Sequence, residues 1–419
     1  MNQNILRKQR TYAATMAVVV VFAALFLAVM TWGNYRYASE NPGGNDFLVH
    51  WVGTRALVTE GLNPYSDEVA LRIQTMAYGR PAEAGEHELR VAYPLYSVIV
   101  FLPFALVEDF TLARALWMTA LEAGVLLLVV FSIRLARWKI SPALLGMLLI
   151  FSLFWYHGLR PLINGNAVVL VALLLVGGFL ALRAGADELA GVLFALTTIK
   201  PQVVVLVLVF IVLWGMSTGR WRMIGWLVGT VILLAAAAAL LIPEWFVDNL
   251  REVIRYPSYN PPGTPRAAFI EWWPSWGSRL GWALTGVMSI VLLVEWGLHR
   301  KADFRGFLWT AYLTLVASQW IGIQTDPGNF IVLFPVLILV LSLPDERWRG
   351  GGKIFVVLSL VVLFVGIWAI FLNTVAYGDQ PVQSAVMFFP LPAFLLLTLY
   401  WVRWWAIQPS RLWFDSLDL

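Results

Sequence analysis

Cysteine is absent from the 419-residue sequence, and charged residues are scarce at 13%. The first absence excludes disulfides and thiolate metal sites, so cysteine usage says nothing about the redox compartment. The second excludes an ordinary soluble domain, in which about 25% of residues are charged. A P-loop, a glycine-rich nucleotide fingerprint and an internal repeat are also lacking, and no set of His, Asp and Glu shows metal-ligand spacing. We expect no metal, no cofactor and no nucleic-acid partner.

Hydrophobic residues are abundant and make up 60% of the chain. The longest apolar runs approach the roughly 20 residues that a spanning helix needs, which predicts an all-α polytopic membrane protein. The first run exceeds the apolar core of a signal peptide, about 7–15 residues, so we expect it to be retained. We expect a single membrane domain, residues 1–419, with about twelve spans. The predicted spans are residues 12–33, 112–133, 141–157, 166–182, 187–199, 202–217, 224–242, 281–298, 306–323, 329–343, 354–373 and 386–402.

Basic residues predict the orientation of these spans, because Lys and Arg accumulate in cytoplasmic loops. They fall on one side of the predicted map: Arg7, Lys8, Arg10, Arg134, Arg137, Lys139, Arg220, Arg222, His299, Arg300, Lys301, Arg347, Arg349 and Lys353. We therefore expect a plasma (inner) membrane protein with both termini in the cytoplasm. Residues 403–419 form the predicted cytoplasmic tail.

Two predicted outer loops are long: residues 34–111 and residues 243–280. The first ends in the apolar motif YPLYSVIVFLPFALV (residues 93–107), which Pro94 and Pro103 interrupt. This motif is too short to span comfortably, and it predicts an interfacial or re-entrant helix. The second loop is rich in proline and tryptophan, and it predicts an extended, irregular connection with its tryptophans at headgroup level.

Asp46 lies in the first predicted outer loop, about a dozen residues after the first apolar run. One interpretation is a solvated loop carboxylate. The other is a general base at the membrane surface, where a carboxylate takes the proton of an attacking hydroxyl. Nearby His50 and Arg55 either tune this carboxylate or are ordinary helix-face residues.

Lys200 interrupts an apolar stretch in the motif TTIKPQ, directly before Pro201. A proline break at membrane depth is tolerated where the freed backbone lines a cavity, and an intramembrane lysine is a functional candidate. The alternative is a lysine that snorkels to the outer surface between two short helices.

Three further polar residues lie near the predicted outer side. His157 and Arg160 follow the third apolar run, and a guanidinium there suits either phosphate binding or interfacial anchoring. Asp326 lies in the motif QTDPGN, which a simple turn also explains.

Four short motifs in this order give the sequence a recognisable pattern: NDFLVHW…EGLNPY, YPLYSVIVFLPFAL, NGNAVVLVALLL and TTIKPQVVVLVLV. They resemble glycosyltransferase family 87, formerly a domain of unknown function, over about residues 40–215. The resemblance implies a GT-C-type membrane fold with a long first outer loop carrying interfacial helices. The family includes mannosyltransferases that use polyprenyl-phosphate-mannose.

The resemblance also implies roles for individual residues. Asp46 matches the acidic residue of the first outer loop at the catalytic site, and Tyr65 ends the matching Asn-Pro-Tyr turn. Lys200 matches the lysine of a Lys-Pro pair. Asn166 replaces the glutamine of a Gly-Gln pair, and Val168 replaces an asparagine.

We expect an inverting glycosyltransferase that moves a hexose, mannose by resemblance, from a polyprenyl-phosphate donor to a lipid or glycan acceptor at the outer face. Asp46 is the expected base, and the expected substrate-binding residues are Lys200, Arg160, His157, Asn166, Asp326 and Tyr65. The expected partners are the donor, the acceptor and membrane lipids. A lipid or glycan transporter or flippase, and a non-catalytic membrane assembly protein, are the alternatives.

Overall fold

A computed structural model describes residues 3–260, 263–348, 350–376 and 383–407, and within these ranges the chain is helical without a β-strand element. The first half contains α1 (Gln3–Glu40), α2 (Asn45–Glu60), α3 (Asp67–Tyr78), η1 (Leu95–Ser97), α4 (Val98–Ala105), α5 (Phe110–Ala136), α6 (Pro142–Phe154), α7 (Tyr156–Asn164), α8 (Val168–Arg183), α9 (Asp187–Leu196) and η2 (Thr197–Ile199). The second half contains α10 (Pro201–Thr218), α11 (Trp221–Leu241), α12 (Trp245–Tyr259), α13 (Pro265–Trp272), α14 (Gly277–His299), α15 (Phe304–Ser318), η3 (Pro327–Leu333), α16 (Phe334–Arg347), α17 (Gly350–Thr374), η4 (Ala385–Phe388) and α18 (Pro390–Ile407).

Eight helices of the described part are long and apolar enough to cross a membrane: α1, α5, α10, α11, α14, η3–α16, α17 and η4–α18. The number is up to nine if α6 and α7, which meet at a 48° bend, form one broken span. Each predicted span coincides with a helix or with two consecutive helices, but α8, α9 and α15 are shorter than the eight helices named above. The multi-pass, all-helical architecture is confirmed, whereas the count of about twelve spans is not.

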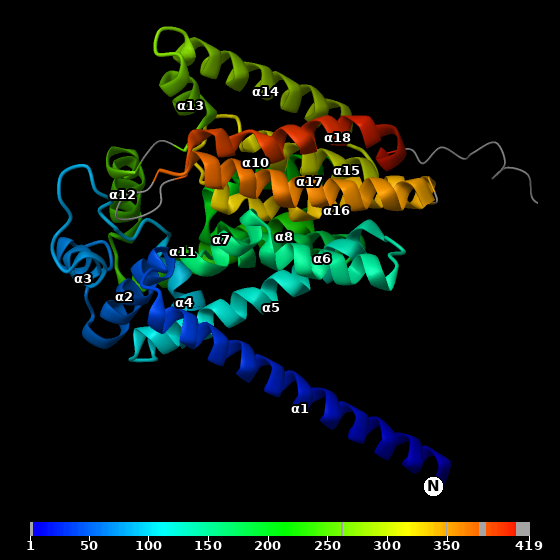
Figure 1. Cartoon of the computed structure of the whole chain (residues 1–419), viewed down its shortest axis with the longest axis horizontal. Helices are drawn as coiled ribbons and strands as arrows, with labels where there is room; N and C mark the ends of the chain where they lie inside the picture. The colour runs from blue at the N-terminus through cyan, green and yellow to red at the C-terminus, as the bar shows by residue number, and fades with distance from the viewer. Residues whose placement is uncertain (1–2, 261–262, 349, 377–382, 408–419) are drawn as a thin grey trace, which may run out of the picture.

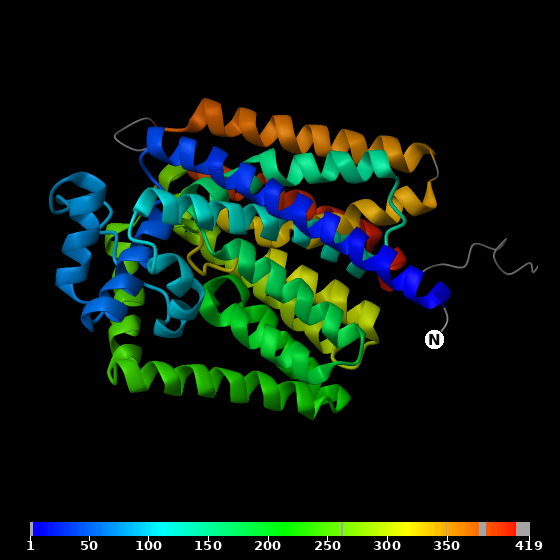
Figure 2. The ribbon, with the colours of Figure 1, turned by 90° about the horizontal axis from the view of Figure 1, so that it is seen from below.

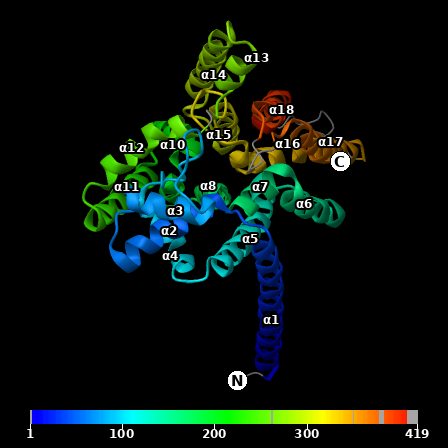
Figure 3. The ribbon, with the colours of Figure 1, turned by 60° about the vertical axis from the view of Figure 1, so that its left-hand side comes forward.

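The η3–α16 segment lies at the centre of the bundle. An 18-residue apolar stretch of it is 94% buried, whereas the corresponding stretch of α1 is 0% buried. Apolar surface on α1 needs no protein cover if it faces lipid, because acyl chains are as apolar as leucine side chains. Figure 2 shows the long helices running roughly alongside one another. Figure 3 shows α1 and the α13–α14 pair projecting from the bundle in different directions.

One end of the bundle carries a group of short helices (Figure 1). There α2, α3 and α12 lie together, and the first turns of α1 lie at the opposite end. Residues 34–111, predicted as an outer loop, contain the end of α1, then α2, α3, η1 and α4, because α1 continues to Glu40. A short apolar helix, Leu95–Ala105, occupies the position where an interfacial or re-entrant helix was predicted.

The prediction of an irregular connection over residues 243–280 is wrong. The segment folds into α12, α13 and the start of α14. Pro265 stands in the first turn of α13, where its missing N–H has no intrahelical partner to lose. Residues 403–407 of the predicted tail are the last residues of α18, and residues 408–419 lie outside the described residues.

Candidate active site

Asp46 occupies the first turn of α2 and is partly buried. The preceding Gly44 has φ 76°, a left-handed conformation that glycine adopts without strain. A Cβ at this position would lie 2.5 Å from Nε of Arg114. The same guanidinium donates a 2.7 Å hydrogen bond to the carbonyl of Asn41. Glycine therefore allows the backbone at the start of α2 to pack closely against Arg114, and this contact fixes the position of Asp46 in the first turn.

The end of α7 meets Asp46 from the other side. Asn164 Nδ2 donates a 3.2 Å hydrogen bond to Asp46 Oδ2. The next residue, Gly165, has φ 73°, and a Cβ there would lie 2.4 Å from Cβ of Phe47. Trp117 Nε1 donates to the Gly165 carbonyl at 2.8 Å. The close approach that glycine permits is what brings Asn164 to the carboxylate.

Lys200 lies at the break between η2 and α10 and is only 4% exposed. Its ammonium donates a 2.7 Å hydrogen bond to Asn166 Oδ1 and lies 5.2 Å from the ring centroid of Tyr93. Cation–π contact and a charge-assisted hydrogen bond both stabilise an ammonium away from water. The side chain is thus directed into the protein and does not snorkel to the surface.

A chain of amides extends from Lys200 into the segment that precedes η3. Asn166 Nδ2 donates to Asn329 Oδ1 at 3.2 Å, and Asn329 Nδ2 donates to Thr325 Oγ1 at 3.2 Å. Asn166 Oδ1 also accepts from the backbone N–H of Val168. The amide of Asn166 is therefore oriented at both ends, and it links α10 to the Asp326 loop.

Asp326 forms the predicted turn and also faces a cation. Its Oδ1 accepts from the Gly328 N–H at 2.5 Å and lies 3.8 Å from Arg160 Nε. Gln383 donates to the other carboxylate oxygen, and Tyr156 donates to Gln383 Oε1 at 2.6 Å. Buried Arg160 Nε has no hydrogen-bond partner in the described part of the chain. Arg160 Nε is therefore held near Asp326 by charge and not by a hydrogen bond.

Two further predicted substrate-binding residues, His157 and Tyr65, bond to backbone carbonyls. His157 is 1% exposed, and its Nδ1 donates to the carbonyl of Pro327 at 2.7 Å. Tyr65 donates from its hydroxyl to the carbonyl of Tyr93 at 2.7 Å. His157 therefore holds the Asp326 loop, and Tyr65 holds the residue whose ring lies near Lys200.

Burial raises the pKa of the Asp46 carboxyl above its ordinary value. Lys200 and Arg160 oppose this shift, the negative charge of Asp326 adds to it, and the hydrogen bond from Asn164 lowers it slightly. Two cations and two carboxylates thus act on one another in this cluster, named here the polar cluster: Asp46, Arg160, Lys200 and Asp326. A carboxylate with a raised pKa is better matched to proton transfer near neutral pH.

The neighbours suggested by sequence spacing do not bond to Asp46. The ring of His50 lies between Tyr93 and Phe101, at centroid distances of 4.0 and 4.3 Å. Burial, with a smaller contribution from Lys200, lowers the pKa of His50 to about 3, so the imidazole is neutral. Arg55 donates to the Ala105 carbonyl at 3.1 Å. Through Phe101 and Ala105, His50 and Arg55 hold α2 against α4.

Sequence reasoning missed Tyr256 of α12. Burial raises the pKa of its phenol, and the negative charges of Asp46 and Asp326 raise it further. Tyr256 lies in the motif YPSYNPP, whose prolines predicted an irregular connection without a functional residue. Asn164 and Asn329 were also missed, since an isolated asparagine carries no spacing signal. In the described ranges, no group of three or more His, Cys, Asp or Glu residues is arranged to hold a metal ion.

Comparison of the sequence with family models identifies one family. The model of glycosyltransferase family 87 matches residues 92–319, which is more than half of the chain. The matched region includes Arg160, Asn166 and Lys200 and begins after Asp46. Comparisons with curated proteins and with solved structures gave no match.

Proposed function

The chain belongs to glycosyltransferase family 87, and on this basis we propose that it transfers a hexose, mannose by family resemblance, from a polyprenyl-phosphate carrier to a lipid or glycan acceptor. The observation that carries the proposal is the polar cluster. Asp46 and Lys200 are 154 positions apart in sequence, yet their charges act on one another together with those of Arg160 and Asp326. A base and two cations are the groups that this reaction requires.

Asp46 is the proposed catalytic base. The oxygen of an acceptor hydroxyl attacks the anomeric carbon, and its proton passes to the Asp46 carboxylate. The bond between the anomeric carbon and the phosphate oxygen breaks, and the prenyl phosphate leaves with the electron pair. Attack opposite the leaving group inverts the anomeric centre. Asn164 holds the carboxylate through one oxygen and leaves the other for the acceptor.

Lys200 and Arg160 are the proposed phosphate contacts. Negative charge develops on the phosphate as the bond breaks, and preorganised cations stabilise it most effectively in a site that excludes water. Lys200 is already oriented by Asn166. Arg160 Nε is buried and lacks a hydrogen-bond partner among the described residues, and guanidinium geometry suits phosphate oxygens. Asp326 keeps Arg160 in place until the donor binds.

The proposed reaction takes place at the outer face of the plasma membrane. The polar cluster draws residues from α2 and α7 and from the start of α10, and α2 lies at the end of the bundle away from the first turns of α1 (Figure 1). A prenyl phosphate remains in the bilayer, so its phosphate has to be met at the interface. Cytoplasmic termini, predicted from the basic loops, place this end outside.

The test is a transfer assay with the whole protein in lipid nanodiscs. Purified protein receives polyprenyl-phosphate-mannose and extracted envelope lipids, and the lipids are then analysed by mass spectrometry. A product heavier by one hexose, with free prenyl phosphate released in equal amount, supports the proposal. Unaltered donor with movement of lipid between leaflets indicates a flippase, and neither change indicates an assembly protein.

A further inference from the structure

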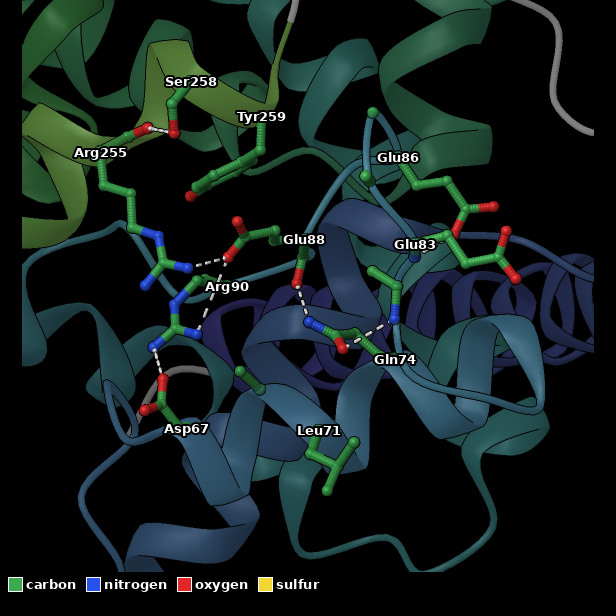
Figure 4. Close-up of a pocket in the computed structure, with 14 residues that line it drawn as sticks. Asp67, Leu71, Gln74, Glu83, Glu86, Glu88, Arg90, Arg255, Ser258 and Tyr259 are labelled. Atoms are coloured by element: carbon green, nitrogen blue, oxygen red, sulfur yellow. Dashed lines mark hydrogen bonds and ion pairs between the residues drawn. The ribbon is translucent and has the colours of Figure 1, made fainter.

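A second polar site lies in the group of short helices, outside the polar cluster. It is a pocket of about 520 Å³ between α3, residues 82–90 and the last turn of α12. This volume lies in the usual range of ligand pockets, about 300–1,000 Å³. Figure 4 shows carboxylate, amide, guanidinium and phenol groups around it. Its lining includes four carboxylates, Asp67, Glu83, Glu86 and Glu88, and two guanidiniums, Arg90 and Arg255.

Ion pairs fix the shape of this pocket. Arg90 is 9% exposed and bonds both Asp67, at 2.6 Å, and Glu252, at 2.9 Å. Arg255 bonds Glu88 at 2.6 Å. These contacts join α3, the following loop and α12, so the polar groups are held in place before any ligand arrives. Preorganised polar groups lose less entropy when they bind.

Tyr259 supplies a hydroxyl that no described residue bonds. The residue is 8% exposed, and its buried Oη has no hydrogen-bond partner within the described residues. Figure 4 shows the hydroxyl directed toward the space between Arg255 and Glu88. Leaving a buried hydroxyl unsatisfied is costly. A ligand hydroxyl in the pocket would remove that cost.

α12 connects this pocket to the polar cluster. Tyr256 and Tyr259 are about one helical turn apart, and their ring centroids are separated by 5.5 Å. The ring of His87 contacts both, at 5.9 and 5.2 Å. α12 also contacts the residue before Tyr93, because Asn249 Nδ2 donates to the Ala92 carbonyl at 3.0 Å. The Tyr93 ring lies 5.2 Å from the ammonium of Lys200, so the pocket and the polar cluster are joined through α12.

We propose that this pocket binds an uncharged carbohydrate, the sugar portion of the acceptor beyond the hydroxyl that reacts. The inference rests on the proposed transferase function. Carboxylates and guanidiniums with fixed positions accept and donate hydrogen bonds to adjacent hydroxyls, which carbohydrates present in pairs. Arg80 bonds Glu86, Arg90 bonds Asp67 and Arg255 bonds Glu88, so the guanidiniums are already paired with carboxylates and offer little uncompensated charge to a phosphate group or another anion. The acceptor is thus a glycan or glycolipid with more than one sugar.

Binding of methyl trimannoside to the whole protein in nanodiscs, measured by calorimetry without donor, tests the pocket directly. We expect saturable binding, and a fall in affinity of roughly 3–10-fold for Tyr259→Phe, the value of one neutral hydrogen bond. Tyr259→Phe should leave the melting temperature unchanged or raise it, because it removes an unsatisfied hydroxyl. Ala84→Trp, at an exposed lining position, should abolish binding by filling the pocket.

Tyr400→Phe is the matched control. It also removes one hydroxyl, but that hydroxyl donates to Glu295 at 3.2 Å, outside the pocket, so stability should fall and sugar affinity should not. A phosphorylated trimannoside and a lysine tetrapeptide are the competing probes. Tighter binding of either, or equal trimannoside affinity for wild type, Tyr259→Phe and Ala84→Trp, would overturn the inference.

Two experimental outcomes distinguish failure of the pocket proposal from failure of the transferase proposal. Trimannoside binding without any sugar transfer from a prenyl-phosphate donor keeps the pocket and refutes the transferase chemistry. Transfer with the same KM for one-sugar and three-sugar acceptors, together with no trimannoside binding, keeps the transferase and refutes the pocket.

Discussion

The ammonium of Lys200 donates a 2.7 Å hydrogen bond to Oδ1 of Asn166, and this amide is itself bonded to Asn329. The three side chains come from the start of α10, the segment before α8, and η3. Among the described residues, Lys200 contacts this neutral amide and forms no ion pair with a carboxylate. This arrangement leaves the ammonium available to an incoming phosphate.

Lys200→Met is expected to weaken donor binding by about 10–100-fold, since a hydrogen bond to a charged group is worth about 1.5–3 kcal/mol. The methionine keeps most of the side-chain length and removes the charge. Titration of polyprenyl phosphate into protein nanodiscs measures the effect. Lys301→Met, at an exposed position after α14, is the control. Wild-type affinity in a normally folded Lys200→Met protein would reduce Lys200 to a structural residue.

The dependence of kcat on pH should report Asp46. Burial raises the pKa of this carboxyl, and only the ionised form accepts a proton, so kcat should fall as the pH drops through that raised value. Lys200 and Arg160 lower the pKa of Asp46. Lys200→Met at saturating donor should therefore move the acid limb to higher pH. An acid limb at the same pH in both proteins would show that another group titrates.

Gly165→Ala should destabilise the protein and misplace Asn164. The left-handed φ of 73° costs an alanine about 1–2 kcal/mol, and the Cβ contact with Phe47 adds about 1–3 kcal/mol of overpacking. Gly61→Ala is the control: its φ is 69°, but a Cβ there has no neighbour within 4 Å, so only the backbone cost applies. Thermal melts of both variants in the same detergent, with transfer rates, compare them. Equal melting temperatures would remove the packing argument.

Sequence patterns predicted the multi-pass helical architecture, because a long apolar run is stable in few structures other than a membrane-spanning helix. They did not predict the lengths of the helices, since α8 and α9 are as apolar as longer helices but have only 16 and 10 residues. The irregular second loop was predicted from its prolines. A proline in a first helical turn, such as Pro265, gives the same signal as a proline in a coil.

The residues of the candidate site were predicted unevenly for a similar reason. A charged residue in an apolar context, such as Lys200, is conspicuous because burial is costly unless it is compensated. Asn164 carries no such signal, and only folding brings it to Asp46. Tyr65 lies in a matching motif, yet its hydroxyl bonds to a backbone carbonyl. His157, which lies outside the four motifs, also bonds to a backbone carbonyl. A motif records that a residue matters to the site without saying whether it touches the substrate.

The orientation in the membrane can be tested with single cysteines, because the chain contains none of its own. Ala84→Cys, in the loop after α3, should react with an impermeant maleimide in intact cells. Lys301→Cys should react only after permeabilisation. Both positions are exposed, whereas position 262, in the predicted second outer loop, lies outside the described residues. The reverse pattern would place the polar cluster at the cytoplasmic face.

Asp46→Asn is the most direct test of the mechanism. The asparagine keeps the size of the side chain and much of its hydrogen bonding with Asn164, but it cannot take a proton near neutral pH. General-base catalysis contributes about 10²–10⁴-fold, so single-turnover transfer should slow by that factor, or about 3–5 kcal/mol of barrier. Donor affinity should change little, because the base faces the acceptor hydroxyl.

The matched control for Asp46→Asn is Asp303→Asn. Asp303 caps α15 by accepting from the Gly306 N–H at 3.0 Å, and asparagine caps a helix about as well as aspartate. Transfer by this variant should match wild type. A transporter carboxylate would lose substrate binding when neutralised, whereas a base loses rate at constant binding. Transfer at the wild-type rate by Asp46→Asn would remove Asp46 from the chemistry, and the contact with Asn164 would then be structural.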